Sequence, residues 1–195
     1  MEDIHLECFH ELLYYDGFNY PSGISKPIML IPSFFTYIHS DAIKTMEWLK
    51  QLLIQEKLWI DGQFLFEHML IPACIKNSHW ILIHINVWNQ TFFPINPCHP
   101  TEPHQGDFDR CHTLIANISQ YFNLPTFYPS MPAIINQFPL QIQENINCGV
   151  FIAVFCLAMI ETNLQSTPDF LRINEYRFLM VVWFLTKSKP SLSTP

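Results

Sequence analysis

The chain has 195 residues, of which 49% are hydrophobic and only 14% are charged, and its formal net charge is −7. This composition is typical of a globular protein with a large core and excludes an intrinsically disordered chain. The chain has only ten Lys and Arg residues, and they form no basic run. The sequence therefore argues against a nucleic-acid-binding protein, because neutralising phosphates requires clustered cations.

The first residues, the apolar run and the cysteines of the chain predict an intracellular protein. The first residues, "MEDIHLECFH", are acidic, and no basic segment precedes an apolar one, so we expect no signal peptide. The apolar run at 148–160 is too short to cross a bilayer. Six scattered cysteines without a CxxC pair favour reduced thiols in an intracellular protein of the cytoplasm or nucleus. We expect a monomer with one domain over 1–188 and a flexible tail at 189–195.

The first third of the chain predicts two helices and a strand. Apolar residues recur at helical spacing from Ile4 to Tyr15, and "PIMLIP" at 27–32 is typical of a short buried strand closed by prolines. Asp41 is placed to N-cap a helix through "AIKTMEWLKQLLIQEK", whose apolar residues form one stripe.

The remainder of the chain alternates strands with helices. "LFEHMLIP" at 65–72 predicts a strand, and "HWILIHINVWNQTFFPIN" at 79–96 predicts a β-hairpin that turns at Asn89 and Gln90. Further predicted elements follow in order: a loop at 97–106, a helix at 107–122, a strand at 132–138, a helix opened by Asn147 and a last helix at 169–186. Because helices and strands are partly segregated along the chain, the fold class that we expect is α+β.

Cys148 stands where a polar loop becomes an apolar helix. Asn147 is a good N-cap residue, so Cys148 would be the first residue of the helix. The positive end of the helix dipole lowers the pKa of a thiol at such a position, as a nucleophilic cysteine requires. The alternative is a small apolar residue that only packs at a helix start, and spacing alone does not separate the two.

A nucleophilic thiol needs a base, and His79 is the candidate. His79 opens the first strand of the predicted hairpin beside Trp80, and Asn96 lies at the end of the returning strand. A tight turn brings both ends to the same rim, where the Asn96 side-chain oxygen could orient the imidazole. The alternative is an exposed strand-end histidine and a turn asparagine before Pro97.

Together these motifs resemble a known family. "HWILIHINVWNQTFFPIN" followed by "NCGVF" resembles the ubiquitin-like-protein-specific cysteine proteases of the Ulp/SENP type, which share a fold with the adenovirus protease. His79-Trp80 and Cys148-Gly149 match the family pattern, as does the order of His, amide or acid, and Cys. The resemblance implies a papain-like α+β fold in which helices flank a central mixed sheet.

The chain departs from the family pattern near the expected site. Asn96 stands where the family usually has Asp, although an amide oxygen orients the histidine in papain-like proteases. Asn147 replaces another Asp and retains its capping role. The family's oxyanion glutamine would fall at Ile142, so either Gln141 or Gln143 would take its place. We favour Gln141, which follows Pro139 by the family's interval.

The resemblance implies a thiol protease or isopeptidase without a cofactor. Cys148 would attack as a thiolate, His79 would be the acid/base and Asn96 would fix its tautomer. Gln141 and the Cys148 backbone N–H would hold the oxyanion. By the same resemblance, Trp80 and Gly149 would bind a substrate that ends in Gly-Gly, the tail of a ubiquitin-like modifier, SUMO-like above others.

Other functions compete with this interpretation. A metal site is one, because the segment 98–112 holds Cys98, His99, His104, Cys111 and His112, although no pair in it has zinc-ligand spacing. The others are an acyltransferase that passes the thioester to an amine, a catalytically impaired binder of ubiquitin-like proteins, and a viral or mobile-element protease that cuts a polyprotein.

Overall fold

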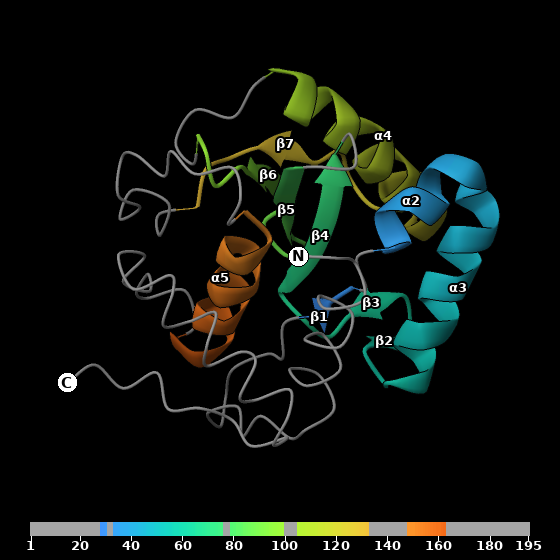
Figure 1. The fold of residues 1–195 in the computed structure, drawn as a ribbon. Helices are drawn as coiled ribbons and strands as arrows, with labels where there is room; N and C mark the ends of the chain where they lie inside the picture. Colours follow the sequence, from blue (N-terminus) through green and yellow to red (C-terminus); the bar gives the residue numbers. More distant parts are fainter. Residues whose placement is uncertain (1–27, 31–32, 76–78, 100–104, 133–147, 163–195) are drawn as a thin grey trace.

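The structure, a computed structural model, describes residues 28–30, 33–75, 79–99, 105–132 and 148–162. Its centre is a five-stranded mixed sheet in the order β1-β4-β5-β6-β7 (Figure 1). The strands are β1 (Ile28–Met29), β4 (His68–Ile75), β5 (His79–Asn86), β6 (Thr91–Ile95) and β7 (Tyr128–Pro129). The three central strands pair antiparallel, whereas β1 and β7 lie parallel to their neighbours.

Helices cover both faces of this sheet. They are α2 (Ser33–Ser40), α3 (Ala42–Gln55), α4 (Gln105–Phe122) and α5 (Cys148–Thr162). In Figure 1, α5 lies against one face, while α2, α3 and α4 lie together on the other side. A small second sheet pairs β2 (Trp59–Ile60) with β3 (Gln63–Phe64) beyond the end of α3. The predicted α+β class with a mixed sheet between helices is confirmed.

Strand alternation divides the core into two layers. Side chains at odd positions of β4 and β5 belong to one cluster with the apolar faces of α2, α3 and α4. The sheet side of this cluster is Met69, Ile71, Ala73, Ile75, Ile81, Ile83 and Ile85. Even positions such as Leu70 and Leu82 are also buried, and α5 packs against β5. Because α5 packs against β5, its apolar first residue, Cys148, is buried.

Several predicted elements are confirmed. Asp41 caps α3, its side chain accepting a hydrogen bond from the Lys44 backbone N–H at 3.2 Å. The hairpin at 79–96 forms with its turn at residues 87–90, where Gln90 has a positive φ of 55°. Helix α4 begins two residues before its predicted start at position 107.

The strand predicted at 65–72 is displaced. It begins at His68 and continues through Pro72 to Ile75. Proline is tolerated there because β1 pairs only with Met69 and Leu70, so Pro72 lies beyond the stretch where β4 is a central strand. The predicted elements at 4–15 and 169–186, the tail at 189–195, the cap Asn147 and all but the first residue of the predicted strand at 132–138 lie outside the described residues.

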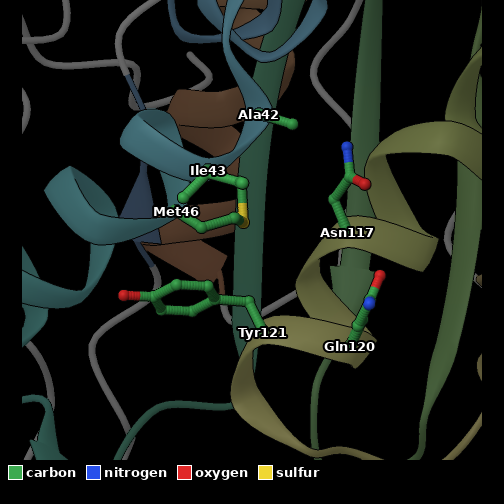
Figure 2. A pocket seen from close by; sticks show the side chains of 6 residues that line it. All are labelled: Ala42, Ile43, Met46, Asn117, Gln120 and Tyr121. Atoms are coloured by element: carbon green, nitrogen blue, oxygen red, sulfur yellow. The ribbon is translucent and has the colours of Figure 1, made fainter.

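Within the described residues, none of the helices is both long and apolar enough to span a bilayer. A surface hollow of about 520 Å³ lies between α3 and α4, lined by Ala42, Ile43, Met46, Asn117, Gln120 and Tyr121. Figure 2 shows these side chains converging from the two helices. The hollow shares no residue with the site described next.

Candidate active site

Cys148 is the first residue of α5, and its residue surface is only 4% exposed. Its Sγ accepts a hydrogen bond from the Trp80 backbone N–H at 3.4 Å. Burial alone would raise the pKa of this thiol. The side-chain hydrogen bond with His79, the N–H groups of Trp80 and Gly149 and the charge on His79 outweigh burial, so the pKa of Cys148 is lowered. These contacts therefore favour the thiolate form of Cys148.

His79 opens β5 and faces this sulfur. The hydrogen bond with Cys148 is the largest influence on the imidazole and raises its pKa. Burial acts in the opposite direction, while the hydrogen bond to Asn96 and the charges on Cys148 and Asp107 raise the pKa further. The pKa of His79 is therefore raised and that of Cys148 lowered, which together favour the thiolate–imidazolium pair.

Asn96 follows β6 directly and is 3% exposed. Its Oδ1 accepts hydrogen bonds from His79 Nε2 at 3.0 Å and from the Cys98 backbone N–H at 3.0 Å. Its Nδ2 donates to Asp107 Oδ2 at 3.1 Å. An acceptor beside Nε2 fixes the proton on that nitrogen. The other ring nitrogen, Nδ1, is thus left to exchange a proton with the sulfur.

The register of the hairpin explains why His79 and Asn96 meet. Leu82 lies opposite Ile95, so continuing the pairing places Asn96 diagonally across from His79 on the neighbouring strand. Diagonal neighbours lie about 7–8 Å apart, which long side chains span. Cys148 arrives from α5, the helix that packs on β5. The structure thus brings together the three side chains that the sequence singled out, although they come from separate elements.

Trp80 and Gly149 also lie next to the sulfur, since the backbone N–H of each is hydrogen-bonded to it. Trp80 is 4% exposed. Gln141 and Gln143, the candidates for the oxyanion glutamine, lie outside the described residues.

Asp107 is the site residue that sequence analysis missed. It lies in the first turn of α4, is 5% exposed and is in contact with both Asn96 and Arg110. An acidic residue in the first turn of a helix is ordinary, because it complements the helix dipole. Its place in the sequence could have revealed it, because the helix that contains Asp107 starts soon after Asn96 and must pack beside the strand that ends there.

Of the segment at 98–112, the structure describes residues 98–99 and 105–112. No group of three or more His, Cys, Asp and Glu side chains there could hold an ion. Cys111 is fully buried among apolar side chains, and this burial raises the pKa of its thiol to about 12. His112 stacks edge-on against Phe92, with ring centroids 5.2 Å apart. His104 lies outside the described residues.

By sequence, the chain matches no known protein family and has no significant match among curated proteins. Its structure is similar to several solved ones, among them the following three. The C-terminal Ulp1 protease domain in complex with Smt3, the yeast ortholog of SUMO, superposes with a TM-score of 0.69 at 14% identity, covering 95% of this chain and 76% of that one. The Ulp1-like SUMO protease catalytic domain of Chaetomium thermophilum gives 0.59 at 18%, covering 93% and 69%.

The third is the effector XopD of Xanthomonas campestris bound to ubiquitin, with a TM-score of 0.58 at 14% identity, covering 90% of this chain and 88% of that one. These similarities extend over nearly the whole chain. The Ulp-type α+β fold, which the His-Trp and Cys-Gly motifs predicted, is confirmed.

Proposed function

We propose that this protein is an intracellular, monomeric cysteine peptidase that hydrolyses the bond after the C-terminal Gly-Gly of a ubiquitin-like modifier, SUMO-like in preference to others. One observation carries the peptidase proposal: a thiol of lowered pKa, an imidazole of raised pKa and an orienting amide form a continuous chain. This arrangement is a nucleophile, its base and the group that orients the base.

Each side chain has a defined part in the reaction. The Cys148 thiolate attacks the carbonyl carbon, and a C–S bond forms while the oxygen becomes an oxyanion. The Cys148 backbone N–H and Gln141, or Gln143, stabilise this oxyanion. The His79 imidazolium then gives its proton to the departing amine as the C–N bond breaks. In the second half of the reaction, His79 takes a proton from a water molecule, and the water oxygen attacks the carbonyl carbon of the thioester. The C–S bond then breaks, which frees the carboxylate product and the Cys148 thiol.

The proposed substrate rests on the fold and on the surroundings of the sulfur. Solved proteins of this fold include a complex with Smt3 and a complex with ubiquitin. Trp80 and Gly149 are assigned to substrate binding by the resemblance, and the position of both beside the sulfur supports this assignment. A Gly-Gly tail has no side chains, so it suits a nucleophile that is 4% exposed. No cofactor is required by this chemistry.

A panel of electrophilic probes tests the proposal. SUMO, ubiquitin and NEDD8, each carrying a C-terminal vinyl sulfone after Gly-Gly, are incubated with the protein and with Cys148→Ala. We expect a covalent adduct with the wild type, fastest with the SUMO probe, and none with Cys148→Ala. Cys156→Ala is the matched control, because Cys156 lies on the same helix and is fully buried.

The outcomes separate the competing functions. Rapid alkylation of Cys148 by iodoacetamide without labelling by any probe would overturn the modifier specificity and favour a polyprotein protease. Binding of a ubiquitin-like protein without alkylation or labelling would overturn the enzyme and favour an impaired binder.

A further inference from the structure

The side chain behind the orienting amide carries a negative charge. Asp107 Oδ2 accepts a hydrogen bond from Asn96 Nδ2 at 3.1 Å, and Asp107 Oδ1 lies 3.3 Å from the Arg110 guanidinium. Asn96 Oδ1 in turn accepts a hydrogen bond from His79 Nε2 at 3.0 Å. A continuous chain of polar contacts therefore runs from the imidazole through the amide to a buried carboxylate.

The carboxylate fixes which way the amide points. A carboxylate accepts hydrogen bonds and donates none, so it holds the NH2 group of Asn96 and directs the amide oxygen to the histidine. The Cys98 backbone N–H at 3.0 Å from Oδ1 supports the same orientation. With the amide reversed, an NH2 group would face a protonated ring nitrogen. Asp107 thus removes the ambiguity that an amide, unlike a carboxylate, brings to this position.

The carboxylate also supplies charge. Asn96 is neutral and stabilises an imidazolium less than a carboxylate would at the same position. Asp107 and Asn96 are 5% and 3% exposed, so the field of the carboxylate reaches the ring through a poorly screened interior, and the amide is polarised along its path. Arg110 opposes this field only in part, because its side chain is 37% exposed.

We propose that Asp107 is a positioning residue that restores, one hydrogen bond behind His79, the negative charge that Asn96 lacks. The inference rests on the proposed function. In it, two side chains together support the imidazole as a single carboxylate would: Asn96 accepts the hydrogen bond from Nε2, and Asp107 provides the charge and fixes the orientation of the amide.

The groups that act on His79 among the described residues agree with this assignment. They are the Cys148 thiol from α5, the Asn96 amide after β6 and the Asp107 carboxylate from α4, and Arg110 pairs with that carboxylate. Of these, Asp107 is the anion that stays whether or not the thiol is charged. The charge on Asp107 acts to raise the pKa of His79, in agreement with the geometry.

Removing the charge while keeping the shape is the first test. Asp107→Asn retains an oxygen that can accept from Asn96. We expect alkylation of Cys148 by iodoacetamide at neutral pH to slow roughly tenfold, as a change of about one pKa unit in the thiolate–imidazolium equilibrium would cause. The upper pKa of the pH–rate profile, at which the imidazolium loses its proton, should move to lower pH. Asp109→Asn is the control, because it removes the same charge from an exposed position of the same helix.

Exchanging the two side chains is the second test. Asn96→Asp alone places two carboxylates in contact, which share a proton, so we expect a rate no better than that of Asp107→Asn. The double variant Asn96→Asp/Asp107→Asn moves the charge to the histidine and leaves one carboxylate facing one amide. We expect its alkylation rate to return to within about threefold of the wild-type rate. Its upper pKa should return near the wild-type value.

These measurements separate this inference from the proposed function. An unchanged rate and pH profile in folded Asp107→Asn would overturn the role of Asp107, whatever the substrate. A folded double variant that is about tenfold slower than the wild type would do the same, and this variant decides the matter if Asp107→Asn does not fold. Failure of the Gly-Gly probes on the wild type contradicts only the proposed function, because iodoacetamide reports the thiolate pair without a modifier.

Discussion

Strand β5 carries a histidine near each end, and the two have opposite properties. His79 is part-buried, and its contacts with Cys148 and Asn96 raise its pKa. His84 is fully buried, and burial lowers its pKa to about 3. Each end has an asparagine and a carboxylate nearby, so residue type alone does not explain the difference. The protonation of a buried histidine is decided by its nearest partner.

The partners at the second end cannot stabilise a charge on His84. Its Nε2 lies 3.0 Å from His68 Nδ1, and His68 Nε2 lies 3.5 Å from Glu67 Oε1. Because the Glu67 carboxylate favours a proton on His68 Nε2, the other nitrogen of His68 is an acceptor and His84 donates a hydrogen bond to it. The carboxylate is therefore adjacent to His68, and any positive charge on His68 lowers the pKa of His84 further. The two imidazoles at this end are therefore held neutral, and their contacts are structural.

The largest expected effect comes from making the same substitution at each end. We expect His79→Gln to lower turnover of a Gly-Gly substrate by about 10³-fold or more, because the thiol loses its base. His84→Gln should leave turnover within about threefold of the wild type, because its amide still donates to His68 and no reacting group is touched. Equal losses in the two variants, measured as kcat/KM and corrected for the folded fraction, would contradict the division of the strand.

The second expected effect is at Asn96, the asparagine at the His79 end of β5. Asn96→Ala should lower turnover by about 10- to 100-fold, because the imidazole loses its orienting acceptor and Asp107 loses its link to the site. The measurement is kcat/KM, with urea unfolding to verify that the variant is folded. A variant that turns over at the wild-type rate would show that the hairpin alone orients His79.

The third comparison concerns acid. His84 has a lowered pKa, so below about pH 6.5 the unfolded chain binds a proton that the folded chain does not bind. The contribution of His84 to the free energy of unfolding is therefore fully present above about pH 6.5 and is lost as the pH falls. Between pH 7 and pH 5 this loss is about 2 kcal/mol for a histidine held neutral. We expect His84→Gln to lose about that much less than the wild type in urea unfolding.

His39→Gln is the control for this titration, because His39 is exposed on α2. Identical acid dependence in His84→Gln and the wild type would refute the burial argument. The sign at His79 is opposite: its raised pKa gives stability that is present below its unfolded pKa and lost as the pH rises through the folded value.

The smallest effect is expected at the hairpin turn. Asn86 donates to Glu67 Oε1 at 2.8 Å and accepts from the Asn89 backbone N–H at 2.8 Å. Asn86→Ala should lower the free energy of unfolding by about 1–2 kcal/mol, since two part-buried hydrogen bonds are lost, and leave Cys148 alkylation unchanged. Chemical denaturation and the alkylation rate check the two halves of this expectation, and a slower alkylation would show that the two ends of β5 are coupled.

The sequence predicted the hairpin and the meeting of His79 with Asn96, because strand periodicity and pairing are local properties. It also predicted the cap at Asp41, which depends only on neighbouring residues. It misplaced β4, since Pro72 marks a strand end only where both sides of the strand are paired. The β2–β3 hairpin was missed although Asp61-Gly62, both with positive φ, is a turn signal.

Asp107 was missed for a different reason. Its position in a helix first turn has an ordinary explanation, and its contact with Asn96 depends on how α4 packs beside β6. Such packing is a property of the assembled layers and not of any one segment. The departure from the family pattern at Asn96 was visible in the sequence, whereas its compensation was visible only in space.

The hairpin also has a practical consequence. Its tip at residues 87–90 lies a whole strand away from Cys148, about 25 Å for the length of β5. Trp88 at this tip is 54% exposed. Because this distance separates the tip from the site, a fluorophore or a short peptide tag attached at position 88 would label the protein without disturbing the sulfur. The tip is the natural attachment point for a labelled version of this molecule.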